Sequence, residues 1–321
     1  MIAYYVYRGG STTQVDQIDR TWLTPGSDVR VWADVETPTP ADGEVLRDTF
    51  GLHPLAVQDA LERLQNPKVE TYPGVLYVVL HGITFTPESD TFETDDTDFF
   101  LSREFLVTVH HSPRRSIEEV GRLCVANDII LKEGTVALMH RIIDRMVDHY
   151  RPEVDEVEER LDKIEDQVIE CPSTELTREI LTIKRDISQM RRIVLPQRDV
   201  VGRLSRREFD IIDQEMSYRF RDVFDQLVRM ADSAIIFQER VTGILDAHLA
   251  SISNQLAVSS QRLAAVATVF GTLTVLTGLY GMNVRLPGAT ESSPWPFWGI
   301  VAFGVAITAA LLVLFRRKGW L

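Results

Sequence analysis

The sequence predicts an α+β membrane protein with an N-terminal cytoplasmic α/β domain, a long coiled-coil-like stalk helix and two C-terminal transmembrane helices. Two uncharged apolar runs, residues 263–284 and 292–315, each exceed the roughly 18 apolar residues that indicate a membrane span. A heptad pattern without proline precedes the first run. Strand and short-helix signals alternate over the first 115 residues. These observations divide the chain into a water-exposed part before residue 263 and a membrane hairpin formed by the two apolar runs.

Residues 1–115 are expected to form a compact α/β domain with a mixed sheet. Stretches rich in β-branched and aromatic residues predict strands at 2–7, 29–35, 75–85 and 99–109. Turns rich in Pro and Gly precede short helices expected at 43–50 and 54–64. No glycine-rich phosphate loop follows a strand, so nucleotide binding has no support in the sequence.

Residues 116–200 predict a cytoplasmic helical hairpin. The stretch 134–170 is dense in Asp and Glu, and Pro152 is expected to kink or divide it. Ser173 can cap a following helix that carries Lys and Arg and ends near Leu195. The opposite charges fit two antiparallel helices, and a simple solvated helical face fits them equally well.

The next segment predicts one continuous helix from about residue 213 through residue 280, on the order of 100 Å long. Its apolar residues alternate steps of four and three, which indicates helix packing within or between subunits. They are Met216, Phe220, Val223, Leu227, Met230, Ala234, Phe237, Val241 and Ile244. The expected segments are a stalk at 201–262, a first span at 263–284, a loop at 285–294, a second span at 295–315 and a basic tail at 316–321.

Net charge, cysteine content and the positions of basic residues indicate the type of partner, the cellular compartment and the membrane orientation. The formal net charge of −13 argues against a nucleic-acid partner and suits attraction of cations. The two cysteines lack a C-x-x-C spacing, which fits a reducing compartment, and no signal peptide is recognised. Arg262 precedes the first span, and Arg316, Arg317 and Lys318 follow the second. The positive-inside rule then predicts a multi-pass protein of the cell's inner (plasma) membrane with both termini cytoplasmic.

The first span is the better candidate to line an ion path. It contains four threonines and two glycines, whereas the second span is richer in Ala, Val, Ile and Leu. Small and hydroxyl residues permit close helix approach and can face a wet axis. Packing between helices is the alternative role for the threonines. Two spans cannot enclose a water-filled path, so a channel requires a symmetric oligomer.

The end of the first span, Tyr280-Gly281-Met282-Asn283, resembles the CorA family of magnesium channels and transporters. Similar stretches are Leu273-Thr274, Gly278-Leu279-Tyr280, Arg221 to Gln226 and Lys318 to Leu321, over about the last third of the chain. The resemblance implies a homopentamer in a lipid bilayer that moves divalent cations. Mg²⁺ would be both transported and regulatory, with Co²⁺ and Ni²⁺ also accepted. No catalytic residue is identified, so the chain is not expected to be an enzyme.

Gly281, Met282 and Asn283 are the expected selectivity filter. Mg²⁺ gives up its waters reluctantly, and a ring of Asn283 amide oxygens can hold the hydrated ion without a formal charge. Gly281 lets the backbone turn, and Met282 is expected to pack the outer helix end. A plain helix C-terminus with a glycine cap is the alternative.

The resemblance also implies pore-lining and regulatory residues. Leu263, Thr274 and Tyr280 match pore positions, and Asp246 matches an acidic ring below the membrane. A regulatory divalent-cation site would join Asp222 to a carboxylate of a neighbouring subunit, for which the candidates are Glu88 and Asp90. Two close carboxylates repel, and a cation between them removes the repulsion. The alternative is that Asp222 is a solvated coiled-coil residue.

Departures from the family keep other functions open. Thr272 stands where many members carry proline, and Ala257 and Ser260-Gln261 stand where members carry a polar Asn and a Met-Lys pair near the inner mouth. A zinc transporter of the ZntB type coupled to protons is the first alternative, although Met282 favours magnesium. A membrane-anchored coiled-coil scaffold is the second. His110-His111, with His81 upstream, is expected to be structural, because adjacent residues on a strand point to opposite faces.

Overall fold

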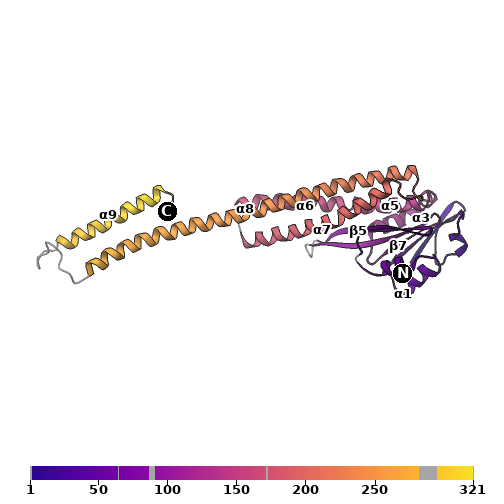
Figure 1. Ribbon diagram of the computed structural model, residues 1–321, viewed down its shortest axis with the longest axis horizontal. Helices are drawn as coiled ribbons and strands as arrows, with labels where there is room; N and C mark the ends of the chain where they lie inside the picture. The colour runs from indigo at the N-terminus through magenta and orange to yellow at the C-terminus, as the bar shows by residue number, and fades with distance from the viewer. Residues whose placement is uncertain (1, 64, 87–90, 171–172, 282–294, 321) are drawn as a thin grey trace. The chain divides into compact units, whose positions relative to one another are not determined.

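The computed structural model describes residues 2–63, 65–86, 91–170, 173–281 and 295–320 (Figure 1). It divides into two compact units. Unit 1 comprises Met1–Asp166 and Thr174–Ile244, and unit 2 comprises Gln167–Ser173 and Leu245–Leu321. The long helix α8 (Gln214–Gly281) contributes residues to both units. The division into seven segments stays a prediction.

Unit 1 contains one mixed sheet of seven strands in the order β2-β1-β3-β7-β6-β5-β4. Strands β3 and β7 are parallel, and the other neighbouring pairs are antiparallel. The expected mixed sheet is confirmed. The strands are β1 (Ile2–Arg8), β2 (Ser11–Val15), β3 (Arg30–Glu36), β4 (Lys68–Tyr72), β5 (Val75–Thr86), β6 (Thr91–Leu101) and β7 (Phe105–His110).

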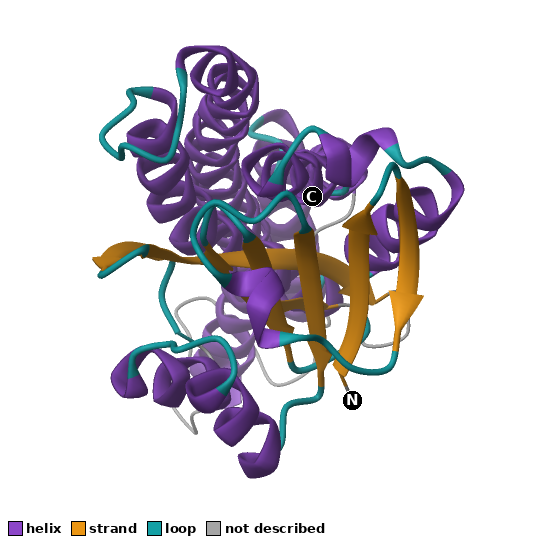
Figure 2. Cartoon of the chain, turned by 90° about the vertical axis from the view of Figure 1, so that its right-hand side faces the viewer, coloured by secondary structure: helices purple, strands orange, loops and turns teal. Residues whose placement is uncertain are grey.

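Helices cover both faces of the sheet (Figure 2). On one face, Leu46 of α1 (Pro40–Asp48) and Val57 of α2 (Pro54–Leu61) share a buried core with Val31, Ala33 and Val35 of β3. On the other face, Trp32 stacks on Tyr5, and the Tyr5 ring lies against Gly121 of α3 (Arg115–Ala126). Alternate residues of one strand therefore serve two cores, as the period of a strand requires.

Two strands and one turn of the sheet differ from the sequence-based prediction. Strands β2 and β4 are not predicted from the sequence, because they lie at the two edges of the sheet and are mostly polar. The stretch 99–109, predicted as one strand, contains the end of β6 and the start of β7. Ser102 N–H donates to the Phe105 carbonyl oxygen at 2.8 Å and closes the turn between them.

The helix bounds correct two further predictions. The acidic stretch divides at His149, between α5 (Thr135–Asp148) and α6 (Tyr150–Glu170). Pro152 therefore lies in the first turn of α6, where proline is tolerated. Helix α7 (Thr174–Ser205) continues through Pro196 instead of ending near Leu195. Tertiary packing overrides the proline there, since Val194 and Val200 on either side are buried. The remaining short helices are η1 (Arg20–Leu23) and α4 (Ile129–Lys132).

Helices α6, α7 and the first part of α8 form a three-helix bundle. Arg160 of α6 pairs with Asp186 of α7 at 3.3 Å. Arg240 of α8 reaches Asp162 and Glu165 of α6 at 2.6 and 2.7 Å. Ser188 of α7 donates to Gln238 of α8 at 3.1 Å. All nine residues of the heptad seam, from Met216 to Ile244, are buried within this one chain.

Unit 2 contains the remainder of α8 and helix α9 (Trp295–Arg317). By length and composition, two helices can cross a membrane. The first candidate lies within Gln214–Gly278 with a mean hydropathy of 1.3, and the second is Phe297–Arg317 with a mean hydropathy of 2.4. Large apolar side chains are exposed on both, for example Phe270 at 66 % and Val305 at 64 %. Such surface suits lipid or another protein, and does not suit water.

Candidate ion pathway and cation-sensing carboxylates

A heptad-spaced polar stripe follows α8 from unit 1 into unit 2. Its members are Asp225, Asp232, Glu239, Asp246, Ser253, Ser260, Ala267, Thr274 and Gly281, and each is exposed. Heptad spacing turns each member about 20° from the one before it in a straight helix, so neighbouring members share a side, while the first and last members lie about 160° apart. Four carboxylates are followed by hydroxyl or small residues through the candidate first span. Sequence analysis identified Asp246, Thr274 and Gly281 and missed the spacing that joins them.

The threonine hydroxyls of the first span are satisfied by their own helix. Thr268, Thr272, Thr274 and Thr277 each donate to the carbonyl oxygen four residues earlier, at 2.7 to 2.9 Å. A hydroxyl that donates in this way keeps its lone pairs free to accept. Thr274 is exposed, so its oxygen can accept from the water shell of a cation. Thr272 lies two residues, or about 200°, away around the helix.

Of the other predicted pore and filter residues, the structure describes some and not others. Leu263 lies on α8 with 71 % of its surface exposed, three residues after Ser260 of the stripe. Tyr280 and Gly281 form the last turn of α8. Met282 and Asn283 lie outside the described residues, as do Glu88 and Asp90.

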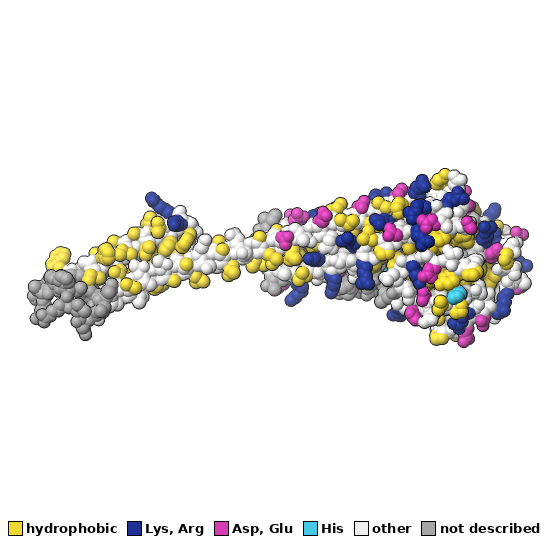
Figure 3. Space-filling view, in the orientation of Figure 1, with side chains coloured by type: hydrophobic (Ala, Val, Ile, Leu, Met, Phe, Trp, Pro, Cys, Tyr) yellow, Lys and Arg dark blue, Asp and Glu magenta, His cyan; other side chains and the backbone are white. Residues whose placement is uncertain are grey.

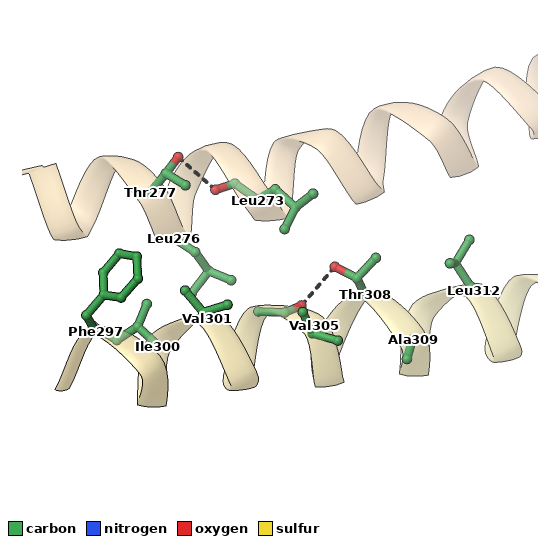
Figure 4. Close-up of a pocket in the computed structure, with 11 residues that line it drawn as sticks. Leu273, Leu276, Thr277, Phe297, Ile300, Val301, Val305, Thr308, Ala309 and Leu312 are labelled. Carbon is green, nitrogen blue, oxygen red and sulfur yellow. Dashed lines mark hydrogen bonds between the residues drawn. The ribbon is translucent and has the colours of Figure 1, made fainter. Parts of the chain in front are cut away.

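An apolar groove of about 580 Å³ lies between α8 and α9 (Figure 4). Leu273, Leu276 and Thr277 face it from α8, and Val305 and Thr308 from α9. The Thr277 hydroxyl donates to the Leu273 carbonyl oxygen and the Thr308 hydroxyl to that of Gly304. Since both donors are satisfied and no lining side chain is charged, the groove suits hydrocarbon and not an ion.

Asp222 lies on the exposed side of α8, and its charge acts on Asp144 of α5 in the same chain. Burial raises the pKa of Asp144, and the negative charges of Asp148 and Asp222 raise it further. His140, one turn earlier on α5, acts in the opposite direction. Sequence analysis missed Asp144; its position four residues after His140, on one helix face, was the available signal.

The described residues contain no group of three His, Cys, Asp or Glu side chains arranged to hold a metal ion. A cation at Asp222 and Asp144 therefore requires further ligands. His110 has a structural environment, since its Nδ1 lies 2.6 Å from the Ser112 carbonyl oxygen and its Nε2 lies 3.2 Å from Asp34.

The sheet of unit 1 carries one buried carboxyl group with a large pKa shift. Asp98 of β6 is fully buried and accepts from the Tyr77 hydroxyl. Burial raises the pKa of Asp98 to about 8, and the charges of Asp96 and Asp59 act in the same direction. The Tyr77 hydrogen bond and the charge of Lys68 oppose the shift. Asp98 is therefore largely protonated in the folded protein near neutral pH.

These features define a membrane protein with two candidate spans, one of them the end of a long helix with a polar stripe. The family described as CorA-like Mg²⁺ transporter protein matches residues 27–317. The chain belongs to this family of divalent-cation transporters, which are not enzymes.

Relatives match along most of the chain. The putative metal ion transporter YfjQ of Bacillus subtilis is 28 % identical, over 96 % of this chain and 92 % of its own. The cobalt/magnesium transport protein CorA of Thermotoga maritima is 29 % identical, over 85 % of this chain and 78 % of its own. The zinc transport protein ZntB of Yersinia pseudotuberculosis is 22 % identical, over 90 % and 88 %.

A solved structure has the same fold. The complete structure of the CorA magnesium transporter from Methanocaldococcus jannaschii aligns with a TM-score of 0.86 at 22 % identity, over 100 % of this chain and 99 % of its own. The predicted fold class is confirmed: an N-terminal α/β domain, a long helix and two C-terminal apolar helices.

Proposed function

We propose that this chain forms a cyclic homo-oligomer, a pentamer by analogy with the family, that conducts Mg²⁺ across the plasma membrane along α8. The observation that carries the proposal is the polar stripe of α8. Carboxylates at Asp232 and Asp246 would concentrate cations at the cytoplasmic end, and the hydroxyls of Ser260 and Thr274 would accept from hydrated ions. Co²⁺ and Ni²⁺ would pass by the same contacts.

Selectivity would arise at the end of the stripe. Gly281 continues the heptad spacing, and Asn283 follows it by two residues. Amide oxygens at Asn283 would hold the hydrated cation weakly enough for release, and Met282 would pack the outer end of the helix. Tyr280 and Leu263 would border the path. Arg262, and the basic residues Arg316, Arg317 and Lys318 at the end of α9, favour cytoplasmic termini for each subunit in the lipid bilayer.

Cytoplasmic Mg²⁺ would control this path through Asp222. The repulsion between Asp222 and Asp144 within one chain supports a divalent cation there, because a cation would neutralise both. The partner's Glu88 or Asp90 would complete the ligand set. Bound Mg²⁺ would hold neighbouring subunits in a closed arrangement, and its loss would release them. The ion shifts this equilibrium only by its different affinity for the two arrangements.

The test is Mg²⁺ uptake by liposomes that contain the purified full-length protein. Uptake driven by the Mg²⁺ gradient alone, and unchanged by a pH gradient, is the expected result. The similarity to a zinc transport protein makes proton-coupled zinc transport the second candidate, and Zn²⁺ uptake that requires a pH gradient would support it instead. Absence of any divalent-cation flux from an assembled oligomer would favour a membrane-anchored scaffold.

A further inference from the structure

The three-helix bundle of unit 1 has two outward faces of opposite charge. Helix α6 contains nine acidic and three basic residues, whereas α7 contains seven basic and four acidic residues. Figure 3 shows Lys and Arg side chains along the lower part of the bundle, where Figure 1 draws α7. Each helix contacts the other two through one side, so the outward faces of α6 and α7 point in different directions.

The outward face of α7 is a row of arginines at heptad spacing. Arg178, Arg185 and Arg192 are exposed, and within the described residues none of the three forms an ion pair. Arg192 also borders an open pocket of about 400 Å³ beside Arg191 and Pro196. Three guanidinium groups on one face of a helix suit a row of carboxylates, because each can bind one through paired hydrogen bonds.

The outward face of α6 carries that row. Asp155, Glu159 and Asp166 are exposed and lie opposite the buried positions Val157 and Leu161. Within the described residues, Asp155 and Asp166 form no ion pair, while Glu159 pairs with Lys163 of its own helix at 2.7 Å. Asp162 and Glu165, in contrast, are already bound by Arg240 of α8.

The two rows are matched in height along the bundle. Two contacts fix the antiparallel register of α6 and α7: Arg160 to Asp186, and the Tyr150 hydroxyl, which accepts from Gln197 at 2.8 Å. Asp155 lies five residues before Arg160, and Arg192 lies six residues after Asp186. Because the two helices are antiparallel, Asp155 and Arg192 are at nearly the same height. Glu159 with Arg185, and Asp166 with Arg178, likewise agree to within two residues, or about 3 Å along a helix.

We propose that the arginine row of α7 binds the carboxylate row of α6 in a second copy of this chain. A rotation about an axis parallel to the bundle keeps equal heights together, so all three pairs form at once. The contact joins two different patches, and such a head-to-tail contact forms a ring when its rotation closes and an open filament when it does not. This interface rests on the proposed function, since a pore on the symmetry axis requires a ring. The matched heights favour a second copy over an anionic membrane surface.

The test uses disulfide cross-linking of the full-length protein in detergent, in a Cys171→Ser background. Cys124 is buried and is left in place. Asp155→Cys combined with Arg192→Cys is expected to give a ladder of cross-linked species up to the complete ring. Either single-cysteine variant is expected to give no cross-link, because in the proposed interface the α6 row of one copy contacts the α7 row of another copy, so two identical cysteines do not come together. The matched control combines Asp155→Cys with Arg178→Cys, which differ in height by about 20 Å.

Exchanging the charges of the two rows tests how much the proposed ion pairs contribute to assembly. Reversal of the three arginines to Glu is expected to raise the concentration needed for assembly at least about tenfold, since like charges across an interface are costly. Reversal of Asp155, Glu159 and Asp166 to Arg in the same chain is expected to restore assembly.

Three outcomes would overturn the interface: cross-linking of the control pair as strongly as the matched pair, a dimer from Arg192→Cys alone, or no restoration of assembly by the second charge reversal. If mass photometry shows an assembled oligomer with Mg²⁺ flux but no ladder, only the interface is wrong; a monomer contradicts the ring itself.

Discussion

The two stretches of helix α8 differ in how their apolar side chains are covered. In residues 214–244, the apolar seam is buried against α6, α7 and the α/β domain, with Phe220 and Leu227 fully covered. In residues 245–281, many large apolar side chains are exposed, with Leu256 at 70 % and Leu263 at 71 %, although Ala265 is buried. A periodic pattern thus sets which side chains share a face, and it does not set what covers that face. The exposed apolar surface of the second stretch suits lipid or another protein surface.

The polar groups of the two stretches of α8 have different kinds of partner. In the first stretch, Arg240 satisfies its charge on another helix, through Asp162 and Glu165. In the second, the threonine hydroxyls donate to their own backbone. Without water or a neighbouring helix, a hydroxyl can find a partner only one turn earlier. The predictions below test whether the second stretch is a lined ion path or a plain anchor.

The largest effect is expected at the end of the path. Asn283→Ala should nearly abolish Mg²⁺ uptake by liposomes while the oligomer remains intact by mass photometry, because the amide that holds the hydrated ion is lost. Asn254→Ala is the matched control, since Asn254 is exposed on α8 one residue away from the polar stripe. Uptake at the wild-type rate from an assembled Asn283→Ala protein would exclude its role in selectivity.

A pair of threonines tests the orientation of α8. Thr274→Val should lower Mg²⁺ uptake by about tenfold, the size expected when about 1.4 kcal/mol of barrier is added. Thr272→Val removes an equivalent hydroxyl, bonded to the Thr268 carbonyl oxygen, from the other side of the helix. It should leave uptake nearly unchanged. Equal effects of the two variants would show that neither side of α8 is specific to the path.

The next effect concerns regulation. Limited proteolysis of the full-length protein should be slowed by Mg²⁺, and Asp222→Asn or Asp144→Asn should remove most of this protection, because each takes away one repelling carboxylate. Asp48→Asn, at an exposed carboxylate of α1 outside the polar stripe, serves as the control. If Mg²⁺ protects the Asp222→Asn protein as well as the wild type, Asp222 is not part of the sensor.

A smaller, salt-dependent effect is expected at Asp246. Removing its charge in Asp246→Ala should lower conductance about twofold at low ionic strength and have no effect at about 1 M salt, where charges are screened within about 3 Å. Asp246→Glu keeps the charge and should conduct as the wild type. A loss in the Ala variant that persists at high salt would point to a direct contact with the ion.

The last prediction concerns the pH dependence of the stability of unit 1, not ion flux. The pKa of Asp98 is about 8 in the folded protein and near 3.8 in an unfolded chain. Between these values the folded state binds the extra proton, so stability falls as pH rises from about 4 to 8. Asp98→Asn should flatten this slope and raise the melting temperature at pH 8. Asp48→Asn, on the exposed side of α1, is the control. An unchanged slope in Asp98→Asn would show that Asp98 is ionised when folded.

The sequence by itself determined the elements that depend on local periodicity and length. The continuous helix α8, the two apolar helices, and the mixed α/β domain all follow from residue patterns that neighbours in space do not alter. Thr274 and Gly281 could be identified in the same way, because they lie in a recognisable stretch at the end of one helix. Edge strands β2 and β4 could not, since one side of each faces solvent and their polar residues resemble a loop.

Only the tertiary structure decided features that join distant residues. Helix α7 continues through Pro196 because packing on both sides outweighs the loss of one hydrogen bond. The charge of Asp222 acts on Asp144, and the arginine row of α7 stands level with the carboxylate row of α6, because α5 packs near α8 and α6 packs against α7 in a fixed register. Sequence spacing fixes which face of a helix a residue occupies, whereas the residues opposite that face are chosen by the burial of the shared core.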